Sequence, residues 1–256
     1  MIYGKRFFYF FMFSEELQNK IIKYYQNYYK SCGLRDFKLR AENKLREEAV
    51  EEKRLLRLEE FLLLKKLQAK ECFIMGAGTG GLAVVLKEKY NINVSGCEPD
   101  IVALDILKEK LKQKGIDDVG FTADFGEHLT SFKSSFFDLV YCYTVLEHVQ
   151  NVEKCLAEMI RITKPGASVY VNTPNYGFPE ERHYKIRWPF PPAYLPRAFS
   201  YLYLILRGKP PKFFKSLNLL TKRRLSKILS RHKNIKTKPL SPVKSSTQEL
   251  LLKKLA

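Results

Sequence analysis

Hydrophobic and polar residues are arranged in two alternating kinds of block across the middle of the chain. Short apolar runs are typical of buried strands, and the longer amphipathic stretches between them are typical of helices. The strands are predicted at Glu71–Met75, Val94–Glu98, Phe137–Tyr143 and Ser168–Asn172, and the helices at Leu82–Lys89, Ile101–Lys114 and Val152–Ile162. Alternation at this spacing predicts an α/β fold, doubly wound around a mostly parallel sheet.

The flanking segments have different patterns. A Lys/Glu/Leu-rich stretch without Gly or Pro runs from Ala41 to Lys66, and Ser14 is a typical helix cap. Beyond Pro174 the composition shifts to prolines, aromatics and bases. We therefore expect an N-terminal helical extension at 1–68, an α/β core at 69–175, and a basic, aromatic-rich cap with an amphipathic helix and a tail at 176–256.

The third region is predicted to hold two helices and a loose end. Pro196 and Gly208 bracket an apolar helix, and Leu220–His232 forms an amphipathic helix opened by Thr221. The remaining Lys233–Ala256 is polar and Lys-rich, so we expect a frayed end with at most a short strand near Ile235. Little is then left for the final antiparallel hairpin that such folds often carry.

The last third of the chain carries the whole excess of positive charge. The net charge is +18, and from Arg182 to the end 19 Lys or Arg residues stand against one acid, Glu249, whereas the preceding residues are neutral overall. Such segregation favours an anionic partner, namely a phosphorylated substrate, an acidic membrane surface or nucleic acid. The alternative is a solvated basic surface.

The cysteines and apolar runs indicate the compartment. Five cysteines form no CxxC pair, which argues against a zinc or disulfide scaffold and favours a reducing cytoplasm. The Phe7–Phe13 cluster is short and lacks a small-residue cleavage site, and no apolar run is long enough to span a bilayer. We expect a cytoplasmic protein, soluble or peripheral at the inner face of the membrane, without a metal.

The first chemical signal is the run Gly76-Ala77-Gly78-Thr79-Gly80-Gly81, which follows a predicted strand and opens a helix. Glycines let the backbone turn sharply and approach a ligand closely. The run fits either a dinucleotide site or an S-adenosylmethionine site. Glu98, at the end of the next strand, is placed to accept hydrogen bonds from both hydroxyls of an adenosine ribose.

Later segments distinguish these two cofactors. Phe137-Asp138-Leu139-Val140, Val145-Leu146-Glu147-His148-Val149 and Arg161-Ile162-Thr163-Lys164-Pro165-Gly166 resemble successive blocks of class I S-adenosylmethionine-dependent methyltransferases, especially the small-molecule group. In that group the Leu-Glu-His segment begins a helix. Pro174-Asn175 and Glu181–Tyr184 more loosely resemble the insertion of methyltransferases from glycan and lipid-linked sugar pathways.

The resemblance implies a Rossmann-like fold, S-adenosylmethionine as cofactor and a set of binding residues. Gly76, Gly78 and Gly80, with Ala77 and Thr79 between them, would frame the methionine and ribose, and Glu98 would hold the ribose. The adenine would be flanked by Asp124 and Phe125, and the donor would lie near Tyr143 and Thr144. One departure is Ile74, where the family usually has an acid that orients the methionine.

The resemblance also suggests catalytic and substrate residues. A sulfonium donor is already activated, so the protein has mainly to align the reactants, and an acceptor hydroxyl would be helped by a base such as His. His148 is the first candidate, although a helix-start His can simply bond to the backbone. His183 is the second candidate, with Arg182 and Tyr184 beside it expected to contact the acceptor.

We therefore expect O-methylation of a small-molecule, sugar or lipid-linked acceptor, with peripheral contact to an anionic membrane through 182–238. An RNA methyltransferase is less favoured, because Tyr141-Cys142-Tyr143-Thr144 stands where an Asn-Pro-Pro-aromatic motif would lie. A weakly active or inactive binding protein that retains the fold remains an alternative because of Ile74, and a nicotinamide dehydrogenase is a more distant one.

Overall fold

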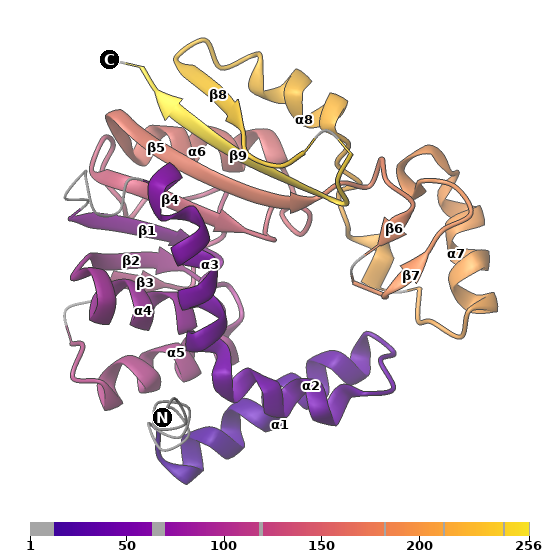
Figure 1. Cartoon of the computed structure of the whole chain (residues 1–256), viewed down its shortest axis with the longest axis horizontal. Coiled ribbons are helices and arrows are strands. Elements are labelled where there is room, and N and C mark those ends of the chain that lie inside the picture. The colour runs from indigo at the N-terminus through magenta and orange to yellow at the C-terminus, as the bar shows by residue number, and fades with distance from the viewer. Residues whose placement is uncertain are drawn as a thin grey trace, which may run out of the picture.

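The computed structural model describes residues 13–62, 70–117, 120–181, 183–211, 213–242 and 244–255. Its centre is a seven-stranded sheet in the order β3-β2-β1-β4-β5-β9-β8 (Figure 1). The strands are β1 Glu71–Met75, β2 Asn93–Cys97, β3 Gly120–Thr122, β4 Phe137–Tyr143, β5 Thr163–Pro174, β8 Ile235–Pro239 and β9 Thr247–Lys254. The first five are parallel, which confirms the predicted Rossmann-like fold.

Helices cover both faces of the sheet. On one face α4 Gly81–Tyr90 and α5 Ile101–Gln113 pack on the strands, and on the other face α6 Val152–Ile162 does so. Side chains alternate along β1 between the two cores, as Ile74 packs on one side and Phe73 on the other. The order in which strands are added to the sheet reverses between β1 and β4, and ligands of doubly wound sheets bind at the carboxyl ends of the strands at such a point.

The described part of the N-terminal segment, residues 13–62, is helical, as predicted. It contains α1 Glu15–Ser31, α2 Phe37–Asn43, a short 3-10 turn at Lys44–Arg46, and α3 Glu47–Leu62, which packs on α4. The Ser14 side chain caps α1 by accepting from the N–H of Leu17. Of the predicted Phe7–Phe13 cluster only Phe13 lies among the described residues.

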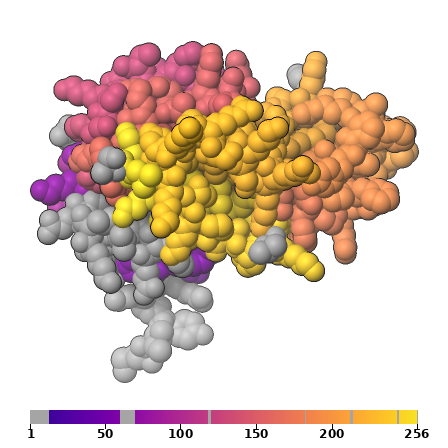
Figure 2. Space-filling model, turned by 90° about the horizontal axis from the view of Figure 1, so that it is seen from above, coloured from indigo at the N-terminus to yellow at the C-terminus, as the bar shows by residue number. Residues whose placement is uncertain are grey.

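A separate lobe follows β5, and we call residues 176–219 the cap. It contains β6 Glu180–Glu181, β7 Ile186–Arg187, a 3-10 turn at Pro192–Tyr194, α7 Arg197–Leu206 and a second 3-10 turn at Phe213–Lys215. It has its own aromatic core, which includes Tyr184 and Trp188. The cap protrudes from the body of the molecule in orange in Figure 2. After it, α8 Lys222–Leu229 returns the chain to the sheet and is capped by Thr221, as predicted.

The expectation of a frayed tail without the antiparallel hairpin is wrong. β8 and β9 pair with each other, and β9 inserts antiparallel beside β5. Leu252 packs into the core on one face of the sheet and Leu251 against the core on the other. Because both faces are covered, the strand lacks a polar alternation that would identify it.

The five cysteines are buried and free, and Cys72, Cys97 and Cys142 lie within strands as expected. Among the described residues no helix is both long and apolar enough to cross a bilayer.

Candidate functional site

The glycine turn joins β1 to α4 at the carboxyl edge of the sheet. Gly76, Gly78 and Gly80 have φ angles of +64°, +55° and +86°, a region that side chains disfavour. A Cβ on Gly76 would lie 2.5 Å from Val145 Cγ2, whereas a Cβ on Gly78 would meet nothing within 4 Å. The turn is therefore tight against the protein at Gly76 and open at Gly78.

Glu98 follows β2 and lies directly beside this turn. The N–H of Gly78 donates to Glu98 Oε2 at 2.7 Å, and the N–H of Asp100 donates to Oε1 at 3.0 Å. Each carboxylate oxygen accepts only one of these bonds, so both retain a lone pair for a further donor. Burial raises the pKa of Glu98, and the two backbone hydrogen bonds offset part of that effect.

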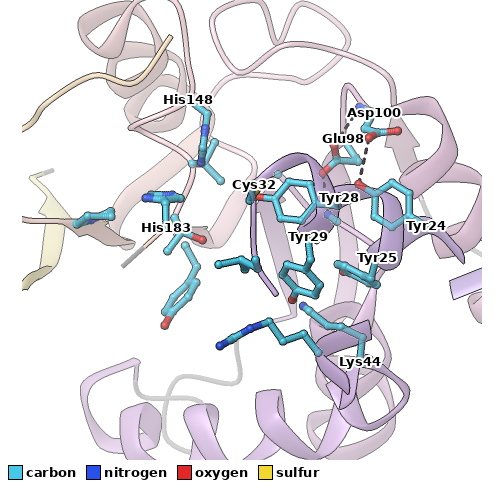
Figure 3. Close-up of a pocket in the computed structure, with 18 of the residues that line it drawn as sticks. Tyr24, Tyr25, Tyr28, Tyr29, Cys32, Lys44, Glu98, Asp100, His148 and His183 are labelled. Atoms are coloured by element: carbon cyan, nitrogen blue, oxygen red, sulfur yellow. Dashed lines mark hydrogen bonds between the residues drawn. The ribbon is translucent and has the colours of Figure 1, made fainter. Parts of the chain in front are cut away.

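A cavity of about 700 Å³ opens in front of the turn. Gly76, Gly78 and Glu98 line it, and so do His148 and His183, which lie at the opposite end from Glu98 in Figure 3. Tyr28 and Tyr29 of α1 lie between these ends in Figure 3, and Tyr24 lies beside Asp100. The remaining lining residues are Tyr24, Tyr25, Tyr28, Tyr29, Cys32, Leu34, Arg40, Lys44, Arg54, Pro99, Asp100, Tyr143, Thr144, Val145, Pro174, Lys185 and Thr247.

The segment after β4 brings its residues to the cavity through a turn, and the helix starts at the predicted Val152 and not at Leu146–His148, where the family resemblance would begin it. The N–H of His148 bonds to the carbonyl of Val145, and α6 begins only at Val152. The cap fixes this turn, since Asn218 donates its backbone N–H to the carbonyl of Glu147 at 2.8 Å and its side-chain amide to the carbonyl of Val149. Thr144 lies in the left-handed region with φ +54°, a strained conformation typical of functional sites.

Two histidines and a carboxylate meet at the far end of the cavity. The rings of His148 and His183 are edge to face with centroids 5.3 Å apart. Glu147 is fully buried and accepts a hydrogen bond from Thr173 Oγ1 at 2.9 Å. Burial raises the pKa of Glu147 to about 7, and burial together with the nearby His183 lowers the pKa of His148 to about 4. These groups can bind a proton or a cation.

Several predicted site residues do not line the cavity. The hydroxyl of Thr79 faces away and donates to Glu47 Oε2 at 2.6 Å. Phe125 is largely exposed, and Asp124 accepts from Thr122 and Ser131. Tyr184 is buried in the core of the cap, where its hydroxyl donates to the carbonyl of Pro210. Ala77 and Gly80 lie in the turn without lining the cavity.

Arg182, which was predicted to contact the acceptor, lies outside the described residues.

The sequence interpretation missed the wall that α1 provides. Tyr24, Tyr25, Tyr28 and Tyr29 line the cavity from one helix, and the hydroxyl of Tyr24 donates to Asp100 Oδ2 at 3.0 Å. Tyrosines spaced by four positions share a helix face, which is a signal that could have identified them. Glu147 was also missed as a chemical group, although it stands beside His148 in the sequence.

Comparisons with known proteins agree with this geometry. The methyltransferase domain family matches residues 74–171. Norajmaline N-methyltransferase of Rauvolfia serpentina is 33% identical over 104 residues, covering 40% of this chain and 35% of that protein. The ubiquinone biosynthesis O-methyltransferase of Azoarcus sp. is 29% identical over 112 residues, covering 44% of this chain and 47% of that protein.

A solved structure extends the similarity beyond the matched domain. The YcgJ protein of Bacillus subtilis superposes with a TM-score of 0.56 at 14% identity, covering 78% of this chain and 99% of that one. At this identity the match supports the fold alone. The chain spans less than half the length of the two curated relatives that it matches.

Proposed function

Residues 74–171 are a class I methyltransferase domain, and from this premise we propose that the chain transfers a methyl group from S-adenosylmethionine to a hydroxyl of a small-molecule, sugar or lipid-linked acceptor. The proposal rests on one observation. The open glycine turn at Gly78 and the carboxylate of Glu98 adjoin at the end of a cavity large enough for a nucleoside.

The donor is assigned to the end of the cavity that contains Glu98. A ribose there can donate its hydroxyls to the lone pairs of Glu98 that remain, and the cavity continues past Tyr143 at the end of β4. Ile74 is buried in the sheet and cannot replace the usual acid. Arg54 pairs with Glu51, and its guanidinium carbon lies 3.7 Å from the ring centroid of Tyr143; its further N–H groups are the ones that could bind the methionine carboxylate instead.

The acceptor is assigned to the end that contains the histidines. A hydroxyl must lose its proton when it is methylated, whereas a neutral amine attacks through its lone pair first. The cluster of Glu147, His148 and His183 supplies groups that promote such a proton loss. This chemistry favours an oxygen acceptor, although the curated relatives include N- and O-methyltransferases.

Calorimetric titration tests the donor assignment. We expect the protein to bind S-adenosylmethionine and its demethylated product S-adenosylhomocysteine at one site, and to show no binding of NAD. Binding of neither methyl donor nor product would support a protein that retains the fold without catalysis. Binding of NAD alone would indicate a nicotinamide enzyme.

A second observation supports contact of the cap with an anionic membrane. On α7, Phe199 and Leu206 expose 64% and 75% of their surface, and Leu202 and Ile205 are also exposed. The surrounding segment from 182 to 248 contains no acid. An apolar helix face with basic residues around it suits the interface of a bilayer that contains acidic lipids. This contact would bring a lipid-linked acceptor close to the cavity.

Vesicle flotation tests this contact. We expect the protein to bind phosphatidylglycerol vesicles and Phe199→Ser/Leu206→Ser to bind at least about tenfold more weakly, since each lost side chain removes more than ~1 kcal/mol of apolar burial. Leu39→Ser, which changes an exposed leucine on α2, is the matched control and should bind like the wild type. Binding to RNA in gel shifts without vesicle binding would favour an RNA methyltransferase.

A further inference from the structure

We propose that Glu147, His148 and His183 bind a divalent transition-metal ion, such as Zn²⁺, Mn²⁺ or Co²⁺, at the acceptor end of the cavity. Each residue offers one ligand atom, and these atoms lie within 4.8 Å of one another. Ligands at ~2.1 Å from a tetrahedral ion lie about 3.4 Å apart, so the most widely separated pair would have to approach by at most about 1.4 Å to close the site. None of the proposed ligands is a cysteine, so the absence of a CxxC pair in the sequence does not bear on this site.

The first support is a buried oxygen that lacks a donor. Glu147 is 0% exposed, and its Oε2 accepts from Thr173. Its other oxygen, Oε1, has no hydrogen-bond partner among the described residues and lies 3.9 Å from Nε2 of His183. A buried carboxylate oxygen without a partner is costly. A cation between Oε1 and the two imidazoles would remove that cost.

The second support is the way His183 is held. Its Nδ1 lies 2.7 Å from Oε1 of Glu181, a buried carboxylate that also accepts from the N–H groups of His183 and Tyr184. Because a carboxylate accepts hydrogen bonds, Nδ1 of His183 is the donor to Glu181, and Nε2 is the ring nitrogen that lies beside Glu147 and is left to coordinate an ion. A carboxylate behind a histidine is the usual support of a metal-binding imidazole.

The composition of the site restricts the ion. Two imidazoles with one carboxylate suit Zn²⁺, Mn²⁺, Fe²⁺ or Co²⁺ better than Mg²⁺ or Ca²⁺, which prefer oxygen ligands. Three protein ligands also leave at least one coordination position for a substrate. Since His148 and His183 line the cavity, that position faces the space assigned to the acceptor.

The ion would deepen the proposed function, on which this part of the inference rests. An acceptor hydroxyl bound to the ion loses its proton to solvent more readily. The resulting oxyanion forms a C–O bond with the methyl carbon as the S–C bond breaks. The electron pair of that bond returns to sulfur, and the sulfonium becomes a neutral thioether.

Metal titration of the chelator-treated protein tests the site without donor or acceptor. With CoCl₂ we expect one equivalent to bind and to give visible d–d absorption, and ZnCl₂ to displace it. Glu147→Gln and His183→Gln should weaken Co²⁺ binding at least tenfold, and Glu181→Gln should weaken it through the orientation of His183 by about tenfold. His128→Gln, which removes an exposed histidine that does not line the cavity, is the control and should bind like the wild type.

The proposal is overturned if the wild type binds no stoichiometric Co²⁺ or Zn²⁺, or if folded Glu147→Gln and His183→Gln bind as tightly as the wild type. Circular dichroism establishes folding, and His148→Gln, which removes the third proposed ligand, should also weaken Co²⁺ binding. Binding of S-adenosylhomocysteine to the chelator-treated protein separates the two proposals. Failure of that binding counts against the donor site, whereas failure of metal binding counts against the ion alone.

Discussion

The backbone N–H of Gly78 donates a 2.7 Å hydrogen bond to the carboxylate of Glu98, so the tips of β1 and β2 are joined at the edge of the cavity. The carbonyl of Cys97 also accepts from the N–H of Ala77 at 3.0 Å. These bonds fix the open turn and the carboxylate relative to each other before a ligand arrives. A preformed site of this kind loses little free energy to ordering on binding.

Replacement of Glu98 by Ala should weaken binding of S-adenosylhomocysteine at least about tenfold, because each lost charge-assisted hydrogen bond to the ribose contributes roughly 1.5–3 kcal/mol. Calorimetry measures the change. Glu88→Ala on α4, which removes an exposed carboxylate paired with Lys114, is the matched control. Equal affinities of Glu98→Ala and the control would show that the ribose does not bind Glu98.

His148→Ala should reduce turnover by about a hundredfold while the affinity for S-adenosylhomocysteine stays within twofold, because His148 lies at the acceptor end of the cavity. The rate of methyl transfer to a hydroxyl compound that the wild type methylates gives the turnover, and calorimetry on the same preparation gives the affinity for S-adenosylhomocysteine. The control is His128→Gln. Unchanged turnover would remove His148 from the mechanism, and a parallel loss of cofactor affinity would place it at the donor end.

Much of the core could be predicted from local patterns. β1, β4 and α6 have the predicted bounds, because each is a buried run or an amphipathic stretch with clear ends. The hairpin was missed because β9 has both faces covered and ends in two lysines, so its composition resembles that of a solvated tail. Local composition cannot reveal that β9 pairs with β5, which is distant in sequence.

The residues of the site also divide into those that local sequence patterns predict and those that they do not. Gly78 and Glu98 are marked by their positions at the ends of strands, and the structure brings them together. The meeting of Glu147 with His183 depends on how the cap packs against the turn after β4, which no spacing in the sequence encodes. Tyr184 was chosen for its proximity to His183 along the chain, but its side chain turns into the core of the cap.

A buried ion cluster ties the N-terminal helices to the glycine turn, and its loss should destabilise the fold. Lys110 of α5 is 1% exposed and contacts Glu48 Oε1 at 2.7 Å and Glu47 Oε2 at 3.2 Å, and Glu47 in turn accepts from Thr79. Lys110→Met should lower the free energy of unfolding by about 3 kcal/mol, because both carboxylates remain buried with less compensation.

Urea unfolding measures this loss. Lys20→Met, which breaks an exposed pair with Glu109, is the control and should cost less than about 1 kcal/mol. If Lys110→Met proved as stable as Lys20→Met, the cluster would contribute nothing to the attachment of these helices.

A carboxylate of the hairpin is expected to make the fold sensitive to acid. Glu249 of β9 accepts two hydrogen bonds from Arg57 of α3, at 2.9 and 2.8 Å, and a third from Asn172 of β5. The hydrogen bonds from Arg57 hold the pKa of Glu249 below its ordinary value despite burial. A lowered folded-state pKa gives stability that is complete above the unfolded value of about 4.3 and is lost as the pH falls through the folded pKa.

Glu249→Gln should therefore lower the free energy of unfolding at pH 7 by about 1–2 kcal/mol, a figure reduced because Arg57 is largely exposed. Its stability should also decline less steeply than that of the wild type as the pH falls below about 4.3, since the group that gains a proton is gone. Urea unfolding at pH 7, 5, 4 and 3 gives both quantities. Glu153→Gln, from an exposed pair with Arg231, is the control and should follow the wild type at every pH. Identical pH profiles for Glu249→Gln and the wild type would mean that the Arg57–Glu249 pair does not couple α3 to the hairpin.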